Sequence, residues 1–191
     1  METETKVLKF LLETEKSLTI REISAEIGSD YKITHTAINR LISKKLVESR
    51  RLGKSCQITL LRKLSLEIIR AEFERRESIL SNDNLRILYD KLDSLPFLFI
   101  AILFGSFIKG KVTKHSDIDL IILAAKETEK KIEQVISFFP LKIHPTFLSY
   151  EEFLDMANSK KFSVVSEAIK KNVILIGIED YYRLIQNVGQ K

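Results

Sequence analysis

Two aspartates, Asp117 and Asp119, are the residues of this chain whose type and spacing best suit chemistry. They flank Ile118 at the start of SDIDLIIL, an apolar run typical of a buried strand. Residues i and i+2 of a strand lie on one face, so both carboxylates are expected to point the same way. Two like charges that close raise each other's cost of ionisation, which a divalent cation removes. Oxygen ligands with few protein donors suit Mg²⁺, so the pair predicts a site for Mg²⁺ or Mn²⁺.

A Gly-Ser pair, Gly105 and Ser106, ends the preceding apolar run Leu95–Phe104 and is expected to face the two aspartates. Glycine lets a ligand approach the backbone closely, and Ser106 offers a hydroxyl and an N–H group. A short helix beginning here would direct free N–H groups at an anion such as phosphate. Lys109 and Lys111 add positive charge nearby. The purely structural alternative is that the aspartates cap loops or pair with lysines.

The segments around these residues alternate between strand and helix patterns. FLFIAILF is apolar on both faces, as expected of a central strand covered on both sides. KETEKKIEQVISFF then predicts a helix and LKIHPTFL a further strand. The C-terminal part predicts a helix, a strand over Val173–Ile178 and a last helix with Tyr181 and Tyr182. This order of elements predicts an α+β domain.

A strand, a Gly-Ser turn, roughly ten residues and Asp-x-Asp in a second strand together resemble the nucleotidyltransferase superfamily that includes DNA polymerase β. FGSFIKGKVTKHSDIDLIIL is most similar to the minimal nucleotidyltransferases, relatives of kanamycin nucleotidyltransferase. The resemblance covers about residues 85–180 and implies a mixed sheet flanked by helices.

The resemblance also implies a role for each matching residue. Gly105 and Ser106 would hold the terminal phosphates of a nucleoside triphosphate. Asp117 and Asp119 would be the catalytic carboxylates that bind the metals carrying the triphosphate. Basic and small residues commonly stand at the positions of Lys111 and Ser116, which places these two near the phosphates.

The strand pattern LKIHPTFL departs from active members of this superfamily, which usually carry a third carboxylate on a later strand of the sheet. His144 or Thr146 occupies the approximate place. A neutral His144 is able to act as a base, since its reference pKa is about 6.5. Beside Pro145 it is equally a packing residue at a strand edge, and we favour packing. The acids that follow, Glu151, Glu152 and Asp155, are expected on a solvated face.

The first sixty residues carry a different pattern. Val7, Leu8, Leu11 and Leu12 recur at helical spacing. A second helix is expected after Thr19, which has Glu22 at capping-box spacing, and before Gly28. KITHTAINRLISKKL predicts a third helix, and VESRRLGKSCQITL predicts a hairpin turning at Leu52-Gly53-Lys54. Three helices followed by a basic hairpin resemble a winged helix-turn-helix domain over roughly residues 3–61.

Positive charge gathers in this region. Residues 32–54 hold seven basic residues against one acid, Glu48, which is a candidate nucleic-acid footprint. A recognition helix would offer polar side chains to the major groove of double-stranded DNA, and the wing would offer cations to phosphate. The alternative is a small protein-interaction module with a solvated basic face. The candidate DNA contacts are Lys32, Thr34, His35, Thr36, Asn39, Arg40, Arg50, Arg51 and Lys54.

Composition excludes several other classes of protein. The 191-residue chain has a net charge of +5, 45% hydrophobic residues and 30% charged residues, which fits a globular protein with a sizeable core. Its longest apolar run, Leu95–Phe104, falls short of the about 20 residues that a membrane helix needs. The segment METETKVLKF lacks the apolar region of a signal peptide. Cys56 is the single cysteine, which excludes an internal disulfide and a zinc cluster. We expect a cytoplasmic protein that does not contact membrane.

The pattern predicts three segments: a winged helix-turn-helix domain at 1–62, a helical connector at 63–82 and a nucleotidyltransferase-like domain at 83–191. Asn82 or Asp83 is expected to cap a helix that runs to about Leu95. The connector helix is typical of a dimerisation arm or a rigid spacer, and the sequence does not choose between them. A homodimer would suit a winged helix that reads two half-sites.

Two functions of different classes follow. In the first, a DNA-binding protein binds a nucleoside triphosphate with Mg²⁺ and transfers a nucleoside monophosphate to a protein, small-molecule or nucleic-acid acceptor. In the second, the chain is a transcriptional regulator whose nucleotidyltransferase-like domain is a catalytically weak or inactive nucleotide sensor. The resemblance also implies a third option, a toxin–antitoxin pairing in which the domain modifies a partner toxin.

Overall fold

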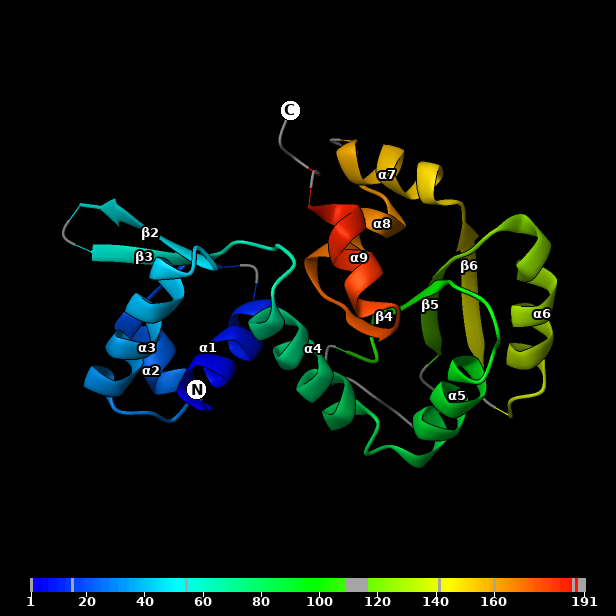
Figure 1. The fold of residues 1–191 in the computed structure, drawn as a ribbon, viewed down its shortest axis with the longest axis horizontal. Coiled ribbons are helices and arrows are strands. Elements are labelled where there is room, and N and C mark those ends of the chain that lie inside the picture. The colour runs from blue at the N-terminus through cyan, green and yellow to red at the C-terminus, as the bar shows by residue number, and fades with distance from the viewer. Residues whose placement is uncertain are drawn as a thin grey trace. The chain divides into compact units, whose positions relative to one another are not determined.

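A computed structural model describes residues 2–14, 16–53, 55–108, 117–140, 142–159, 161–186 and 188 (Figure 1). The chain forms two compact units, residues 1–74 and 75–191, and the boundary lies inside one helix, α4 (Leu66–Ile79). The predicted connector, 63–82, contains this helix. Each unit has its own sheet and is described separately below.

The N-terminal unit contains three helices and a small antiparallel sheet of strand order β1-β3-β2 (Figure 1). The predicted capping box is present: the Thr19 hydroxyl accepts from the Glu22 N–H, and the Glu22 carboxylate accepts from the Thr19 N–H. Gly28 follows this helix with φ +59°, a conformation that glycine adopts without strain. The elements are α1 (Glu2–Glu13), β1 (Leu18–Thr19), α2 (Ile20–Glu26), α3 (Tyr31–Ser43), β2 (Val47–Leu52) and β3 (Ser55–Leu60).

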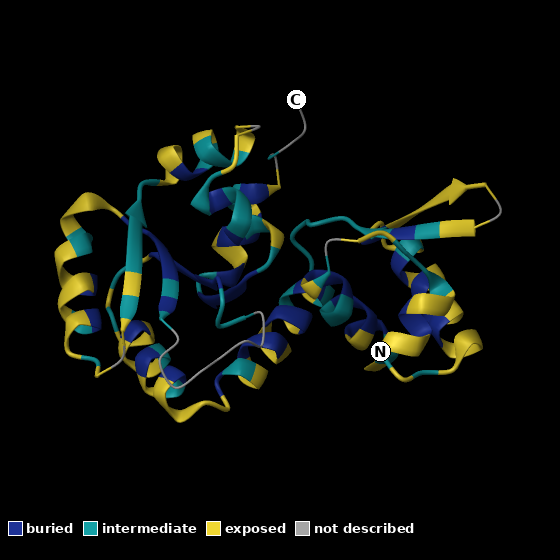
Figure 2. Cartoon of the chain, turned by 180° about the vertical axis from the view of Figure 1, so that it is seen from behind, coloured by how far each residue is buried: buried dark blue, intermediate teal, exposed yellow. Residues whose placement is uncertain are grey.

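The hairpin of this unit forms as the sequence predicts. Strand β2 pairs with β3 from Val47 opposite Leu60 to Leu52 opposite Ser55. Apart from Val47, β2 is exposed along its length, as Figure 2 shows, so the hairpin presents its side chains to solvent. Helix α3 buries Ala37, Ile38 and Leu41 against α1 and α2. The apolar residues of the three helices therefore form one core beneath the hairpin.

The C-terminal unit is built on a mixed four-stranded sheet of order β6-β5-β4-β7. Strand β4 runs antiparallel to β5 and β7, and β5 runs parallel to β6, which confirms the predicted mixed sheet and α+β class. The elements are α5 (Asp83–Asp93), β4 (Ile100–Phe104), β5 (Ile118–Leu123), α6 (Lys126–Ser137), β6 (Ile143–Leu148), α7 (Tyr150–Asn158), α8 (Val164–Lys170), β7 (Val173–Ile176) and α9 (Ile178–Ile185).

Helices cover both faces of this sheet (Figure 1). One face packs on α5 and α6 through a buried cluster that includes Leu103, Leu120 and Ile122. Helices α8 and α9 contact β4, where Tyr181 and Tyr182 are fully buried. All five residues of β4 are buried, as expected of a central strand (Figure 2).

Two predicted strands are shorter in the structure. The run from Leu95 becomes a strand only at Ile100, because its first residues form turns; Pro96 has no N–H for a ladder. The strand predicted over Val173–Ile178 ends at Ile176, where Gly177 adopts φ +77° and α9 begins. The predicted cap of α5 is confirmed, since the Asn82 side chain accepts from the N–H groups of Asn84 and Leu85.

Residues 75 to 79 of α4 belong to the C-terminal unit. The guanidinium of Arg75 donates to the carbonyl of Asn172, and that of Arg76 donates to the carbonyl of Leu175 at 3.0 Å. Arg76 also lies 4.8 Å from the centroid of the Tyr89 ring. These cations satisfy backbone carbonyls at β7, so the end of α4 is anchored there. Among the described helices, none is long and apolar enough to cross a membrane.

Candidate functional site

The turn after β4 brings the backbone of Gly105 directly against the Asp119 carboxylate. Phe104 pairs with Asp119 across β4 and β5, and Gly105 is buried with φ +78°. A Cβ added at Gly105 would overlap Asp119 Oδ2 and would lie 3.1 Å from Cγ. Glycine is therefore required twice, for the left-handed backbone and for the close approach. The result is a buried turn whose main chain lies directly against a carboxylate.

Asp117 lies just before β5 and has two differently placed oxygens. Its Oδ2 accepts from Lys142 Nζ at 2.9 Å, and His144 Nε2 lies 3.6 Å from the same oxygen. Its Oδ1 is buried and has no hydrogen-bond partner among the described residues. An unpartnered buried carboxylate oxygen is costly, so this atom is the first place to expect a ligand.

Strand geometry gathers these residues on one face of the sheet. In the parallel β5–β6 pair, Ile118 is opposite Ile143 and Asp119 is opposite His144. Ile118 packs in the cluster beneath α5 and α6, so its neighbours Asp117 and Asp119 point to the other face. His144 and Lys142 lie on that face by the same alternation. The same-face expectation for the two aspartates therefore agrees with the strand register.

The site's donor set suits a hard divalent cation. Two carboxylates, one with an unpartnered buried oxygen, offer oxygen ligands, and Mg²⁺ commonly takes only one or two of these from the protein. No group of three or more His, Cys, Asp or Glu side chains among the described residues could hold a metal. The residues present thus fit an ion that completes its shell with phosphate and water, rather than a closed protein cage.

The strand register identifies the residue that stands where active members of the superfamily usually carry a third carboxylate. His144, not Thr146, is opposite Asp119, and its side chain is 53% exposed. The predicted packing role is wrong for this residue, since it stands at the polar site rather than in a core. Lys142 was not predicted as a neighbour of this site; its signal was its position two residues before His144, directly before β6 begins.

The remaining predicted phosphate contacts are only partly described. Residues 105–108 form a turn, and Ser106 is half-buried within it. No helix begins at Ser106 within this described turn. Lys111 and Ser116 lie outside the described residues.

In the N-terminal unit, most predicted DNA contacts lie exposed on α3 and β2. Lys32, His35, Thr36, Asn39 and Arg40 are exposed, as are Arg50 and Arg51. Lys54 lies outside the described residues. Asn39 Nδ2 lies 3.2 Å from His35 Nδ1, so these two side chains form a pair on the outer face of α3.

The prediction that Thr34 contacts DNA is wrong. This residue is fully buried, and its hydroxyl donates to the carbonyl of Asp30, the N-cap of α3, at 2.9 Å. The side chain therefore points into the N-terminal unit and cannot contact DNA. The helical spacing carried a sign of this, because Thr34 stands three, four and seven residues before the buried Ala37, Ile38 and Leu41.

Arg40 differs from the other cations because an acid neutralises it. The Glu4 side chain of α1 is only 7% exposed, and its carboxylate lies 2.9 Å from Lys44 Nζ and 3.5 Å from Arg40 Nη1. Burial opposes ionisation of Glu4, but the hydrogen bond and charge of Lys44, with Arg40, outweigh it and lower the pKa of Glu4. The hydrogen bonds that Lys44 donates to Glu4 and then to Glu67 raise the pKa of Lys44. Charge on this side of α3 is thus compensated within the unit.

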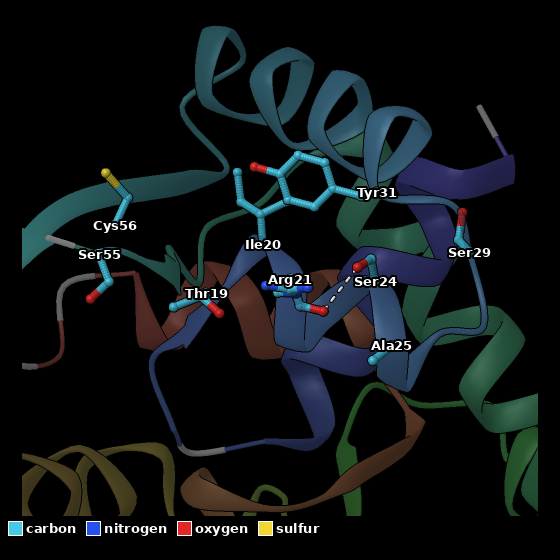
Figure 3. A pocket seen from close by; sticks show the side chains of 9 residues that line it. All are labelled: Thr19, Ile20, Arg21, Ser24, Ala25, Ser29, Tyr31, Ser55 and Cys56. Carbon is cyan, nitrogen blue, oxygen red and sulfur yellow. Dashed lines mark hydrogen bonds between the residues drawn. The ribbon is translucent and has the colours of Figure 1, made fainter.

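A groove on the N-terminal unit contains a cation, Arg21, that no acid of the described residues pairs with (Figure 3). It runs between α2, the start of α3 and β3, and Figure 3 shows Tyr31 extending over Ile20. The guanidinium of Arg21 is exposed and forms no ion pair among the described residues. Sequence reasoning missed Arg21 because it stands on the second helix, outside the basic stretch. The lining residues are Thr19, Ile20, Arg21, Ser24, Ala25, Ser29, Tyr31, Ser55 and Cys56.

Comparison with known proteins bears on the C-terminal unit. Residues 88–180 match the family described as Polymerase beta, Nucleotidyltransferase. The matched segment includes β4, the Gly105 turn, both aspartates and β6 with His144. No curated protein and no solved structure gives a significant match. Residues 88–180 are therefore similar to the nucleotidyltransferase domains of the polymerase β type.

Proposed function

We propose that the C-terminal unit binds a nucleoside triphosphate with Mg²⁺ or Mn²⁺ and transfers a nucleoside monophosphate to an acceptor hydroxyl. The observation that carries this is the contact between the Gly105 backbone and Asp119, in a domain that matches nucleotidyltransferases. A Gly-Ser turn would present backbone N–H groups to phosphate, and Asp117, with one buried oxygen that has no partner among the described residues, lies directly before the neighbouring strand. The acceptor is a protein, a small molecule or a nucleic-acid end.

Each residue has a physical role in this reaction. Asp117 and Asp119 would hold the divalent cation, which neutralises the phosphates and polarises the reacting α-phosphate. Gly105 removes the side chain that would otherwise separate the phosphates from Asp119, and Ser106 donates to a phosphate oxygen. The acceptor oxygen forms a bond to the α-phosphorus as the bond to pyrophosphate breaks. His144, at the same face, accepts the proton of the acceptor hydroxyl.

The competing role is a nucleotide sensor that binds without turnover. It is favoured by the composition of β6 and the residue before it, where His144 and Lys142 stand and no acid is present. Binding and transfer are therefore tested separately.

The binding test uses the full chain with Mn²⁺, followed by electron paramagnetic resonance, and Asp117→Asn beside Asp155→Asn as the matched control. Asp155 is an exposed carboxylate on α7 of the same unit. We expect Asp117→Asn to weaken Mn²⁺ binding at least about tenfold, since one charge and one ligand oxygen are lost. Equal binding by wild type and Asp117→Asn would disprove the metal site.

The transfer test uses α-labelled nucleoside triphosphates, Mg²⁺ and candidate acceptors. Incorporation that depends on Asp117 and falls in His144→Ala supports the enzyme. Nucleotide binding without incorporation in any condition assigns the unit to the sensor role.

We further propose that the N-terminal unit binds double-stranded DNA as a winged helix-turn-helix. Support comes from exposed cations on two elements, Lys32 on α3 and Arg50 and Arg51 on the hairpin, with Arg21 in the groove between them. Phosphates on either side of a groove would meet these cations, while polar α3 side chains would face the bases. Arg40 is excluded from the main contacts because Glu4 already neutralises it.

Fluorescence anisotropy over a salt series tests this interface with the pair Arg21→Ala and Arg40→Ala. Each lost phosphate contact should make the slope of log K against log salt less steep by about 0.9. We expect that change for Arg21→Ala and little change for Arg40→Ala. The single cysteine, Cys56, lines the same groove and is exposed, so bound DNA should also slow its alkylation. No binding at low salt would disprove DNA binding, and a slope that falls only in Arg40→Ala would disprove the groove.

A further inference from the structure

We propose that Lys142 is a tethered cation that competes with the divalent metal for Asp117 and moves to the triphosphate when the nucleotide binds. The inference rests on the proposed nucleotide and metal binding, and it adds the residue that couples the two ligands. Lys142 is a positioning residue here, since it acts through Asp117 and the phosphates.

The backbone of Lys142 is fixed beside Asp117. The Ile118 N–H donates to the Lys142 carbonyl at 2.9 Å, which continues the parallel ladder of β5 and β6. The side chain is not fixed in the same way, because it is 70% exposed and ends in a flexible ammonium group. A fixed backbone with a free side chain allows the ammonium to leave Asp117 without movement of the sheet.

The ion pair satisfies only half of Asp117. Lys142 Nζ lies 2.9 Å from Oδ2, whereas Oδ1 is buried without a partner among the described residues. One monovalent ammonium also leaves one oxygen of Asp117 without a cation partner among the described residues. A divalent cation would meet the charge of both carboxylates, so it competes effectively with Lys142 for this position.

An ammonium displaced from Asp117 needs another anion nearby. Triphosphate oxygens beside the Gly105 turn supply one, and lysine binds phosphate as a compact point charge. The nucleotide draws Lys142 away from Asp117 and so favours the metal, and the metal frees Lys142 for the nucleotide. By linkage, each ligand then raises the affinity for the other.

His144 does not share this role. Its Nε2 lies 3.6 Å from Asp117 Oδ2, beyond hydrogen-bond distance, whereas Lys142 Nζ lies 2.9 Å from the same oxygen. The competition is therefore assigned to the lysine.

Lys142→Met tests the proposal, because it keeps the apolar length of the side chain and removes the charge. Mn²⁺ binding to the full chain without nucleotide is followed by electron paramagnetic resonance. Binding of a fluorescent ATP analogue without metal is followed by anisotropy. Relative to wild type, we expect Mn²⁺ to bind about two- to fivefold tighter, the range that an exposed ion pair provides. The metal-free analogue should bind about two- to fivefold weaker, because the phosphate contact is lost.

A purely structural role of Lys142 would not change the two affinities, for Mn²⁺ and for the ATP analogue, in opposite directions. Lys130→Met, an exposed lysine on α6, is the matched control and should change neither affinity. Unchanged Mn²⁺ affinity in Lys142→Met, or two affinities that move in the same direction, would overturn the proposal. Asp117→Asn separates the two levels: if it leaves Mn²⁺ binding intact, the proposed metal site itself fails, whereas its loss with no effect of Lys142→Met rejects only the competition.

Discussion

Two carboxylates, one in each unit, each pair with a lysine at the same distance, but only one of them has a second oxygen without a partner. Glu4 lies 2.9 Å from Lys44, and Asp117 lies 2.9 Å from Lys142. Glu4 engages Arg40 with its other oxygen, whereas Asp117 Oδ1 is buried with no partner among the described residues.

This difference distinguishes a structural ion pair from a ligand-binding site. Glu4 holds α1 against α3 and has both oxygens occupied by cations of its own chain. Asp117 retains an uncompensated oxygen whose burial costs stability, and such a cost persists where a ligand offsets it. Distance to the nearest lysine does not distinguish the two; the second oxygen does.

The largest expected effect contrasts two glycines with nearly the same backbone. Gly105 and Gly28 have φ values of +78° and +59°, but only Gly105 has a side chain where a Cβ would lie. Gly105→Ala should therefore lose about 3 kcal/mol of unfolding free energy, from strain and overlap with Asp119. Gly28→Ala should lose about 1 kcal/mol, from backbone strain alone.

Denaturation followed by circular dichroism measures both changes, since the chain contains no tryptophan. Hydrogen exchange assigns each loss to its unit. Equal losses in the two variants would show that Asp119 does not press on the Gly105 turn.

The next effect compares the two carboxylates directly. Glu4→Gln should cost about 1–2 kcal/mol, because two charge-assisted contacts are weakened around a buried group whose partners are themselves partly exposed. Asp117→Asn should change stability by less than about 0.5 kcal/mol, since its ion pair is exposed and its Oδ1 has no described partner to lose. Thermal unfolding of both variants is the measurement. A larger loss in Asp117→Asn would make Asp117 the structural carboxylate and break the comparison.

A smaller effect concerns pH. The folded-state pKa of Glu4 is lowered from its ordinary value of 4.5, so its stabilising contribution is present above that value. The contribution is lost as pH falls from about 4.5 through the folded-state pKa. The Tm of wild type should accordingly fall more steeply than that of Glu4→Gln in this acidic range. Parallel curves would show that the pairing of Glu4 has no net effect on stability.

The smallest effect concerns DNA. Glu4→Gln removes the acid that pairs with Arg40, whereas Lys44 keeps its ion pair with Glu67 at 3.0 Å. The slope of log K against log salt should become steeper by about one, since one further cation, Arg40, becomes available on α3. Anisotropy at temperatures where the variant is folded measures the slope. An unchanged slope would place Arg40 away from the phosphates even when Glu4 no longer pairs with it.

Local chemistry decided much of this protein. The capping box of Thr19 and Glu22, the Asn82 cap, the glycine turns and the apolar runs each depend on neighbours within a few residues, so the sequence predicts them. The Gly-Ser and Asp-x-Asp spacing predicted the domain for the same reason, because the two motifs stand on consecutive strands.

Only the tertiary structure decided which polar groups meet. Lys142 reaches Asp117 because β6 joins the sheet parallel to β5, in a register that hydropathy does not specify. Glu4 reaches Arg40 and Lys44 because α1 packs against α3. Ion pairs between residues far apart in the sequence depend on how whole helices and strands pack. The spacing of charged residues along the chain does not predict which of them will meet.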